Sequence, residues 1–291
     1  FTAMYMGFYP ALPEELLNLD MASIDIYKSM GVQTMATFDG YMRSTVFNFL
    51  PLLVGVLGLE LGNGAMAGAE DAGTLEHLAA LPVSRTRPYA AKALAAMLAA
   101  LVVLVVVAAA MAGLFLAIRS EIDTTVTAVD LFRVVLANWL IAFAFLALGL
   151  FLGAILPSGG AARSTASALL VVAFFGNNLA GMVEDLERVQ PILPFSYMAR
   201  VSESLLADVP WDDVAVLVVM GLVLLVAGAI AFARRDLTVG AWPWSGARRG
   251  RLPAGSALAG APSTPPTTPS GRGRAAPAAV GGAVVLVCAL L

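Results

Sequence analysis

The sequence contains few charged residues and almost no cysteine or histidine. Only 13% of its 291 residues are charged, against about 25% in an ordinary soluble domain. The single cysteine, Cys288, excludes an intramolecular disulfide, and the single histidine, His77, excludes a histidine cluster for zinc or iron. A net charge of −3 provides no concentrated basic surface for nucleic acid. These absences exclude a soluble enzyme with an ordinary core, a disulfide scaffold and a nucleic-acid-binding protein.

Apolar residues are abundant instead, at 59% of the chain. A membrane span needs about 20 mostly apolar residues to cross about 30 Å of hydrocarbon. Stretches with almost no charge predict five such spans, at residues 45–67 (interrupted only by Glu60), 93–118, 134–156, 164–183 and 214–233. Their apolar residues occupy all helical faces, and the period-two alternation of a membrane barrel is absent. The sequence therefore predicts an all-α, polytopic integral membrane helical bundle.

The positions of lysine and arginine predict the orientation of this bundle. If the segment after residue 67 is cytoplasmic, the inner segments hold 11 of the 17 basic residues and four of the 20 acids. The outer segments then hold six basic residues and 15 acids. The inner side carries +7 and the outer side −9, with Glu60 accounting for the last −1. We therefore expect the C-terminal tail to lie in the cytoplasm.

The segments outside the five spans have distinct compositions. Residues 1–10 are expected to be the outer end of a truncated first span, which would make six spans in the intact protein. The outer loop 11–44 can hold a short amphipathic helix, and the outer loop 184–213 two short helices. Residues 238–274, rich in Pro, Gly, Ser and Thr, are expected to be disordered. The apolar residues 275–291 fit a further span, a membrane-surface segment or an unstructured end equally well.

A mechanism is suggested by the segment between the spans 45–67 and 93–118. It reads EDAGTLEHLAALPVSRTRPYAAKAL over residues 70–94. Gly73 permits a sharp change of direction, Thr74 can cap a helix, and Pro82 ends that helix. Leu75 and Leu78 fall on one helical face. The pattern predicts a short amphipathic helix over residues 72–82, lying across the cytoplasmic ends of two spans and followed by a basic patch, as a contact for a cytoplasmic partner.

This segment resembles the permease subunits of type-2 ABC transporters, which are membrane partners of a separate ATPase. The resemblance is carried by a glutamate before Gly-Thr-Leu-Glu, then Leu, Pro-Val-Ser-Arg and a lysine opening the next span. The outer stub FYPALPEELLNLD, the closing RRDL at 234–237 and the expected six spans also fit, so it covers residues 1–237. Two features depart from the family pattern, namely the truncated first span and the tail after residue 240.

The resemblance implies a transmembrane domain over residues 1–237 and a coupling helix that docks in a groove of the ATPase. The residues it assigns to this ATPase coupling are Glu70, Gly73, Thr74, Leu75, Glu76, Leu78, Pro82 and Arg85. The partners it implies are an ABC ATP-binding subunit and a second permease copy, as a homodimer or heterodimer, in a prokaryotic cell membrane. The chain has no Gly-x-x-x-x-Gly-Lys-Ser/Thr loop, so ATP and Mg are expected on the partner and no cofactor on this chain.

Five polar residues within the predicted spans are candidates for a translocation pathway, and they are Glu60, Asn48, Asn138, Asn177 and Asn178. Asparagines in spans are more often used for interhelical hydrogen bonds. Glu60 fits a pathway or packing role and fits equally well a side chain that snorkels to the nearby cytoplasmic interface. The scarcity of charge in the spans favours, by analogy, an amphipathic or hydrophobic cargo.

Two other functional classes compete with an ATP-driven exporter. A membrane-embedded enzyme is disfavoured because the sequence has no His-Glu-x-x-His, no Gly-x-Ser-x-Gly and no paired intramembrane aspartates. A secondary carrier without an ATPase partner is the stronger alternative. Such carriers are built from internal repeats and broken spans with several intramembrane charges. Glu60 is the only charge of that kind in the predicted spans, and no inverted repeat is evident.

Overall fold

The computed structural model describes residues 2–12, 37–71, 86–122, 124–156, 158–180, 184–204 and 209–234. Within these ranges the chain forms helices and no strand. Five helical stretches are long and apolar enough to cross a membrane, as predicted, at Phe38–Met66, Thr86–Ile118, Ala128–Ile155, Gly159–Ala180 and Trp211–Arg234. An all-α polytopic bundle is therefore confirmed. Each of the five begins three to seven residues before its predicted start, because polar and charged residues extend the first turns.

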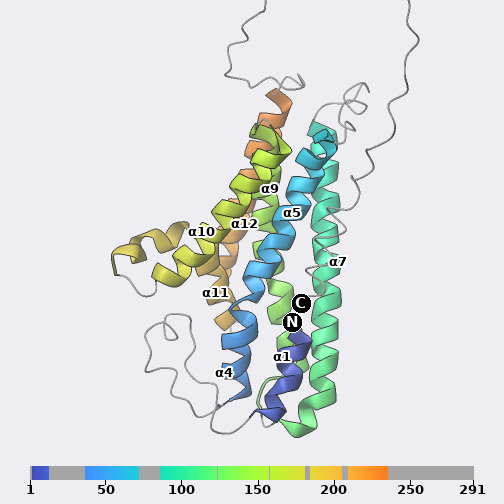
Figure 1. Cartoon of the computed structure of the whole chain (residues 1–291), viewed down its shortest axis with the longest axis vertical. Coiled ribbons are helices and arrows are strands. Elements are labelled where there is room, and N and C mark those ends of the chain that lie inside the picture. Colours follow the sequence, from blue (N-terminus) through green and yellow to red (C-terminus); the bar gives the residue numbers. More distant parts are fainter. Residues whose placement is uncertain are drawn as a thin grey trace, which may run out of the picture.

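The helices in chain order are as follows. The structure contains α1 Thr2–Phe8, η1 Tyr9–Ala11, α4 Phe38–Met42, η3 Arg43–Phe47, α5 Leu50–Asp71, α7 Thr86–Ile118, η4 Arg119–Glu121, α8 Ala128–Ala137, α9 Trp139–Ile155, α10 Gly159–Ala180, η5 Glu184–Ile192, α11 Pro194–Ser204 and α12 Trp211–Arg234. Figure 1 shows that α5, α7, α9 and α12 follow the long axis of the bundle. The end of α5 and the start of α7 lie together at its upper end, whereas α1, α4 and the end of α7 lie at its lower end.

Helix α9 lies at the centre of the bundle, packed against α5 on one side and α12 on another. The α5–α9 contact depends on glycine. A β-carbon added at Gly58 would overlap the backbone carbonyl of Ala142, and one added at Gly62 would overlap that of Leu146. Gly149 of α9 lies equally close to the backbone of α5. Small residues let membrane helices approach until their backbones touch, which maximises van der Waals contact where the hydrophobic effect is weak.

The span that contains α5 is interrupted between α4 and α5. Residues Arg43–Phe47 form a π-helical turn, in which the backbone N–H of Asn48 donates to the carbonyl of Arg43 at 3.0 Å. Pro51 follows in the first turn of α5, where its missing N–H costs little. In a regular α-helix, residues five apart face different directions. The wider π turn brings Arg43 and Asn48 toward the same side of the chain, and such turns are frequent at functional sites.

The outer loop predicted at 184–213 contains two short helices, η5 and α11, as predicted. Helix α11 buries Phe195, Met198 and Val201 on one face, which is the spacing of an amphipathic helix. Its exposed Arg200 forms a forked pair with Asp213 of α12, with nitrogen–oxygen distances of 2.7, 3.0 and 3.1 Å. The same guanidinium lies 4.6 Å from the centre of the Tyr197 ring. These contacts fasten α11 to the start of α12.

Candidate functional site

The residues predicted to contact an ATPase fall mainly outside the described part of the chain. Glu70 lies in the last turn of α5. The other predicted coupling residues, Gly73, Thr74, Leu75, Glu76, Leu78, Pro82 and Arg85, lie outside the described residues. The structure does place the helices on either side of them. Helix α5 ends at Asp71 and α7 begins at Thr86, and both ends lie at the upper end of the bundle (Figure 1).

Side chains at this upper end hold α5, α7, α9 and α12 together. The Nζ of Lys92 in α7 donates a hydrogen bond to the carbonyl oxygen of Ala65 in α5 at 2.7 Å. Tyr89 of α7 is buried, and its ring centre lies 5.9 Å from that of Phe232 in α12. Met66 of α5 and Leu146 of α9 belong to the same apolar cluster. A displacement applied to residues 72–85 would therefore act on a packed group of four helices.

Glu60 pairs with a cation on a neighbouring helix. Its carboxylate lies 3.5 Å from the Nε of Arg163 in α10. The two side chains are 22% and 44% exposed, so neither charge is sealed in the interior. Arg163 lies one turn into α10, near the upper end of the bundle. The structure thus gives Glu60 an ion-pairing role between α5 and α10, close to the end predicted to be cytoplasmic.

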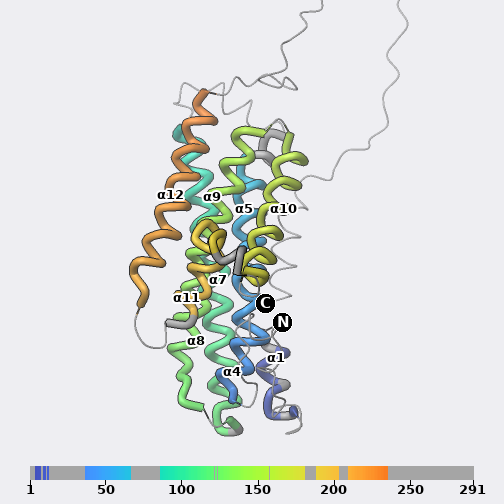
Figure 2. Tube along the Cα trace, turned by 90° about the vertical axis from the view of Figure 1, so that its left-hand side faces the viewer, coloured from blue at the N-terminus to red at the C-terminus, as the bar shows by residue number. Residues whose placement is uncertain are grey.

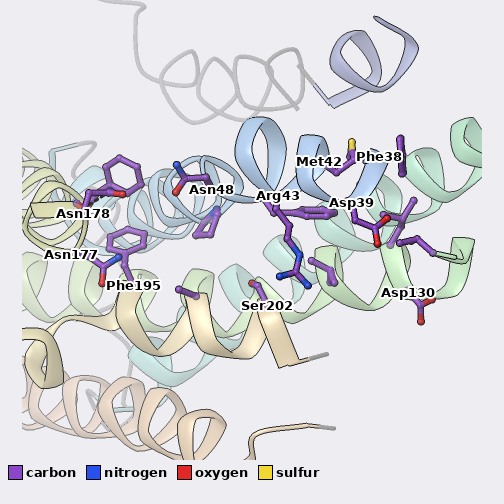
Figure 3. Close-up of a pocket in the computed structure, with 17 residues that line it drawn as sticks. Phe38, Asp39, Met42, Arg43, Asn48, Asp130, Asn177, Asn178, Phe195 and Ser202 are labelled. Atoms are coloured by element: carbon purple, nitrogen blue, oxygen red, sulfur yellow. Dashed lines mark hydrogen bonds between the residues drawn. The ribbon is translucent and has the colours of Figure 1, made fainter. Parts of the chain in front are cut away.

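A pocket lies nearer the lower end, between α4, η3, the start of α5, α8, the end of α10 and α11 (Figure 3). Its apolar walls include Phe38, Phe47, Phe174 and Phe195. Seven polar side chains also line it, namely Asp39, Arg43, Asn48, Asp130, Asn177, Asn178 and Ser202. In Figure 3 the asparagines lie toward one end of the pocket and the two aspartates toward the other, with Arg43 between them. The pocket therefore combines an aromatic surface with charges of both signs.

Several of these polar groups are already hydrogen-bonded. Asp130 forms a capping box with Thr127, accepting from its backbone N–H at 3.0 Å and its hydroxyl at 2.6 Å, and it lies 3.9 Å from Arg133. Asp39 accepts a hydrogen bond from the Thr124 hydroxyl at 2.9 Å. The Nδ2 of Asn178 donates to the carbonyl of Phe174 at 2.9 Å. These contacts hold the two ends of the pocket in place.

Other groups in the pocket have unused hydrogen-bonding capacity. The Nδ2 of Asn48 and the Oγ of Ser202 are buried, and neither has a hydrogen-bond partner among the described residues. Arg43 lines the pocket with its guanidinium directed toward the α11 side, as Figure 3 shows. Within the described ranges it forms no ion pair. Buried polar atoms without partners, such as those of Asn48 and Ser202, are rare and costly in proteins, whereas Arg43 is exposed.

The candidate pathway residues separate into two groups. Asn48 follows η3, and Asn177 and Asn178 lie at the end of α10, so two distant parts of the chain bring the three asparagines into this pocket. Glu60 and Asn138 do not line it. Asn138 lies at the junction of α8 and α9, where its Nδ2 donates to the carbonyl of Val134 at 2.9 Å. A role for any of the five in translocation stays a prediction, but only the first three share a cavity.

Four polar residues of the pocket were not identified from the sequence, and they are Asp39, Arg43, Asp130 and Ser202. Asp39, Arg43 and Asp130 lie just before predicted spans and Ser202 lies in the predicted outer loop 184–213, where polar and charged residues are ordinary. One signal was available for Arg43, because it precedes Asn48 by five residues and Pro51 by eight, a spacing that suits a broken helix. Across the described ranges no group of three His, Cys, Asp or Glu side chains is placed to hold a metal ion.

Comparison with known proteins identifies one family. Residues 1–237 match the sequence model of a family described as "ABC-2 family transporter protein". No curated protein and no solved structure matches the chain. The matched range ends three residues after α12, so it includes every described helix and the segment 72–85.

Proposed function

The chain belongs to the ABC-2 family of transporter proteins and is therefore a permease of an ABC transporter, and we propose that it exports its cargo by coupling to a separate ATPase through residues 72–85. The observation that carries the proposal is the family match over residues 1–237 together with the five membrane-spanning helices. The family implies an ABC ATP-binding subunit as partner. ATP and Mg belong to that subunit.

The arrangement of helices supports the coupling step. Residues 72–85 connect two long helices whose adjoining ends are linked by the hydrogen bond from Lys92 to Ala65. Closure of two ATPase subunits around ATP would push on this segment and so on α5 and α7 together. Helix α5 touches α9 backbone to backbone, so displacement of α5 changes its packing against the centre of the bundle. Alternating access is then a change in the angles between these helices.

We further propose that two permease copies assemble, with the upper end of each in the cytoplasm. The charge asymmetry of +7 against −9 supports this orientation. The broad apolar faces of α7, α10 and α12 are exposed in the single chain, and they are compatible with contact to lipid or to a second copy within the membrane. A cavity between two permeases would then open to either side in turn.

The coupling proposal is tested by co-expressing the full chain with the ATPase encoded by an adjacent gene. We expect the two to copurify, and we expect Glu76→Ala combined with Leu78→Asp to reduce copurified ATPase and ATP-driven transport at least about ten-fold, since a charge would enter an apolar docking surface. Matched control changes at the opposite end, Asp212→Ala with Ile192→Asp, alter exposed residues and should leave both unchanged.

The outcomes of this experiment separate the parts of the proposal. Normal coupling in the Glu76→Ala, Leu78→Asp variant would show that docking occurs elsewhere while leaving the permease assignment intact. Transport driven by an ion gradient, with no ATPase present, would favour a secondary carrier instead. In inverted membrane vesicles the ATPase should be removable from the outer vesicle surface, and its protection inside the vesicle would contradict the proposed orientation.

A further inference from the structure

The lengths of the helices place the pocket near one surface of the membrane. Helices α10 and α12 have 22 and 24 residues, or about 33 and 36 Å, which is close to the thickness of about 30 Å of a hydrocarbon core. Helix α7 has 33 residues, or about 50 Å. Figure 2 shows α7 continuing beyond α10 and α12 toward the lower end. Phe174, Asn177 and Asn178 belong to the last two turns of α10, so the pocket lies beside a membrane surface.

The pocket is lined by two carboxylates, Asp39 and Asp130, and one guanidinium, that of Arg43. The carboxylate of Asp130 is already paired with Arg133 and with its own helix cap. This leaves Arg43 and Asp39, which have opposite charges and are four residues apart across the junction of α4 and η3. Neither has an ion-pair partner among the described residues. A ligand with one negative and one positive group would complement this pair, whereas a simple anion or cation would meet one like charge.

Figure 3 shows Ser202 near the end of the Arg43 side chain, whereas Asn48 lies toward the end of the pocket that holds Asn177 and Asn178. Asn48 Nδ2 and Ser202 Oγ are buried without partners, and the Arg43 side chain extends toward α11, which carries Ser202 (Figure 3). An anionic oxygen placed between Arg43 and Ser202 would receive charge-assisted hydrogen bonds, which are about twice as strong as neutral ones. The adjoining rings of Phe174 and Phe195, whose centres are 5.5 Å apart, offer an apolar surface to the rest of such a ligand.

We propose that this pocket binds the zwitterionic headgroup of an amphiphile. The anionic group lies between Arg43 and Ser202, the cationic group faces Asp39, and the apolar part lies against Phe174 and Phe195. The position of the pocket at the membrane surface and its mixed aromatic and charged lining both fit this class of ligand. The proposal concerns binding to this chain alone, so it does not depend on the ATPase partner or on residues 72–85.

The test is native mass spectrometry of the purified full chain in detergent, titrated with short-chain phosphatidylethanolamine, phosphatidylglycerol or free phosphoethanolamine. Phosphatidylethanolamine should bind more tightly than phosphatidylglycerol, which lacks a cationic group. Arg43→Gln and Asp39→Asn should each weaken its binding about ten-fold, the effect of losing one charged contact. Arg119→Gln removes an exposed arginine outside the pocket, near the lower end, and should leave binding unchanged.

Further measurements distinguish a lipid from a water-soluble ligand and show whether the variants are folded. Free phosphoethanolamine that binds as tightly as the lipid, and with the same dependence on Arg43, would support a zwitterion site whose ligand is water-soluble. Arg43→Lys keeps the charge and should recover part of the affinity lost in Arg43→Gln, while equal melting temperatures would show that the variants are folded. Equal binding of phosphatidylethanolamine and phosphatidylglycerol, or no effect of Arg43→Gln, would overturn the proposal.

Discussion

Helices α9 and α7 are both long and apolar, yet they occupy opposite environments. Twelve of the 17 residues of α9 are buried in the single chain, on all of its faces. Only eight of the 33 residues of α7 are buried, and they form one line along the helix. The residues of this line are Tyr89, Ala93, Ala96, Ala100, Leu104, Ala108, Met111 and Phe115. Hydropathy therefore identifies a span but does not tell whether other helices or lipid surround it.

The two helices differ in the kind of small residue that they use. Helix α9 meets α5 at three glycines, where Gly58 faces Ala142, Gly62 faces Leu146, and Gly149 faces Leu59 and Gly62, so the backbones touch. Helix α7 presents alanine to its neighbours and leaves branched residues such as Val102 and Val106 exposed. Gly113 of α7 has no atom near the position of an added β-carbon. Glycine is thus a packing requirement in the α5–α9 contact and is dispensable on the outer face of α7.

Replacing a glycine of the α5–α9 contact by a larger residue should have the largest effect on the yield of folded protein. In Gly58→Leu the added carbons would collide with the backbone of Ala142, which cannot move aside as a flexible side chain can. We expect loss of folded protein, seen as loss of the monodisperse peak in size-exclusion chromatography after detergent extraction. Gly113→Leu, the same change in α7, should leave the peak intact. Equal yields of the two variants would show that α5 and α9 are not in close contact.

Shortening a side chain on the buried face of α7 should have an intermediate effect on the free energy of unfolding. Leu104 is fully buried, whereas Val102 is 61% exposed in the single chain. Leu104→Ala should lower the free energy of unfolding by about 2–5 kcal/mol, the cost of a cavity in a packed core, whereas Val102→Ala should change it by less than about 0.5 kcal/mol. Thermal unfolding in detergent measures both. A large loss for Val102→Ala in membranes but not in detergent would show that a second subunit covers this face.

Breaking the ion pair between Glu60 and Arg163 should have the smallest effect on the free energy of unfolding. Both side chains are partly exposed and 3.5 Å apart, so we expect a coupling energy below about 1 kcal/mol. A double-mutant cycle of Glu60→Gln and Arg163→Gln, measured by thermal unfolding at low and high salt, isolates this term. Additive single effects would mean that the two residues do not interact. A coupling energy well above about 1 kcal/mol would mean that the pair is shielded from water more than its exposure in the single chain indicates.

Much of the fold could be predicted because membrane insertion imposes a simple physical requirement. Long stretches almost free of charge identify the five spans, whereas the orientation derived from the lysine and arginine positions stays a prediction. The boundaries were less accurate. Helix α10 begins at Gly159, five residues before the predicted start, since Arg163 can lie within a helical turn beside Glu60 of α5. A rule that ends each predicted span at a charged residue cannot detect an ion pair between distant segments.

The candidate pocket was only partly predictable for a related reason. Asn48, Asn177 and Asn178 stood out because amides are rare in apolar runs, and the structure brings them together. Arg43 and Ser202 did not stand out, because polar residues are ordinary at the end of a span, where Arg43 lies, and in an outer loop, where Ser202 lies. Their proximity depends on the π turn at Arg43–Phe47 and on the attachment of α11 to α12. Neither feature has a sequence pattern specific enough to identify without a structure.

The forked pair between Arg200 and Asp213 has a consequence for the width of the pocket. It fixes α11, which carries Phe195 and Ser202, to α12, whereas Arg43 and Asn48 belong to the chain that continues into α5. The two sides of the pocket are therefore attached to different helices, and α9 lies between those helices and contacts both. A change in the angle between α5 and α12 about α9 would therefore change the distance from Arg43 to Ser202. Occupancy of the pocket and the relative tilt of these two helices are thus two measures of the same movement.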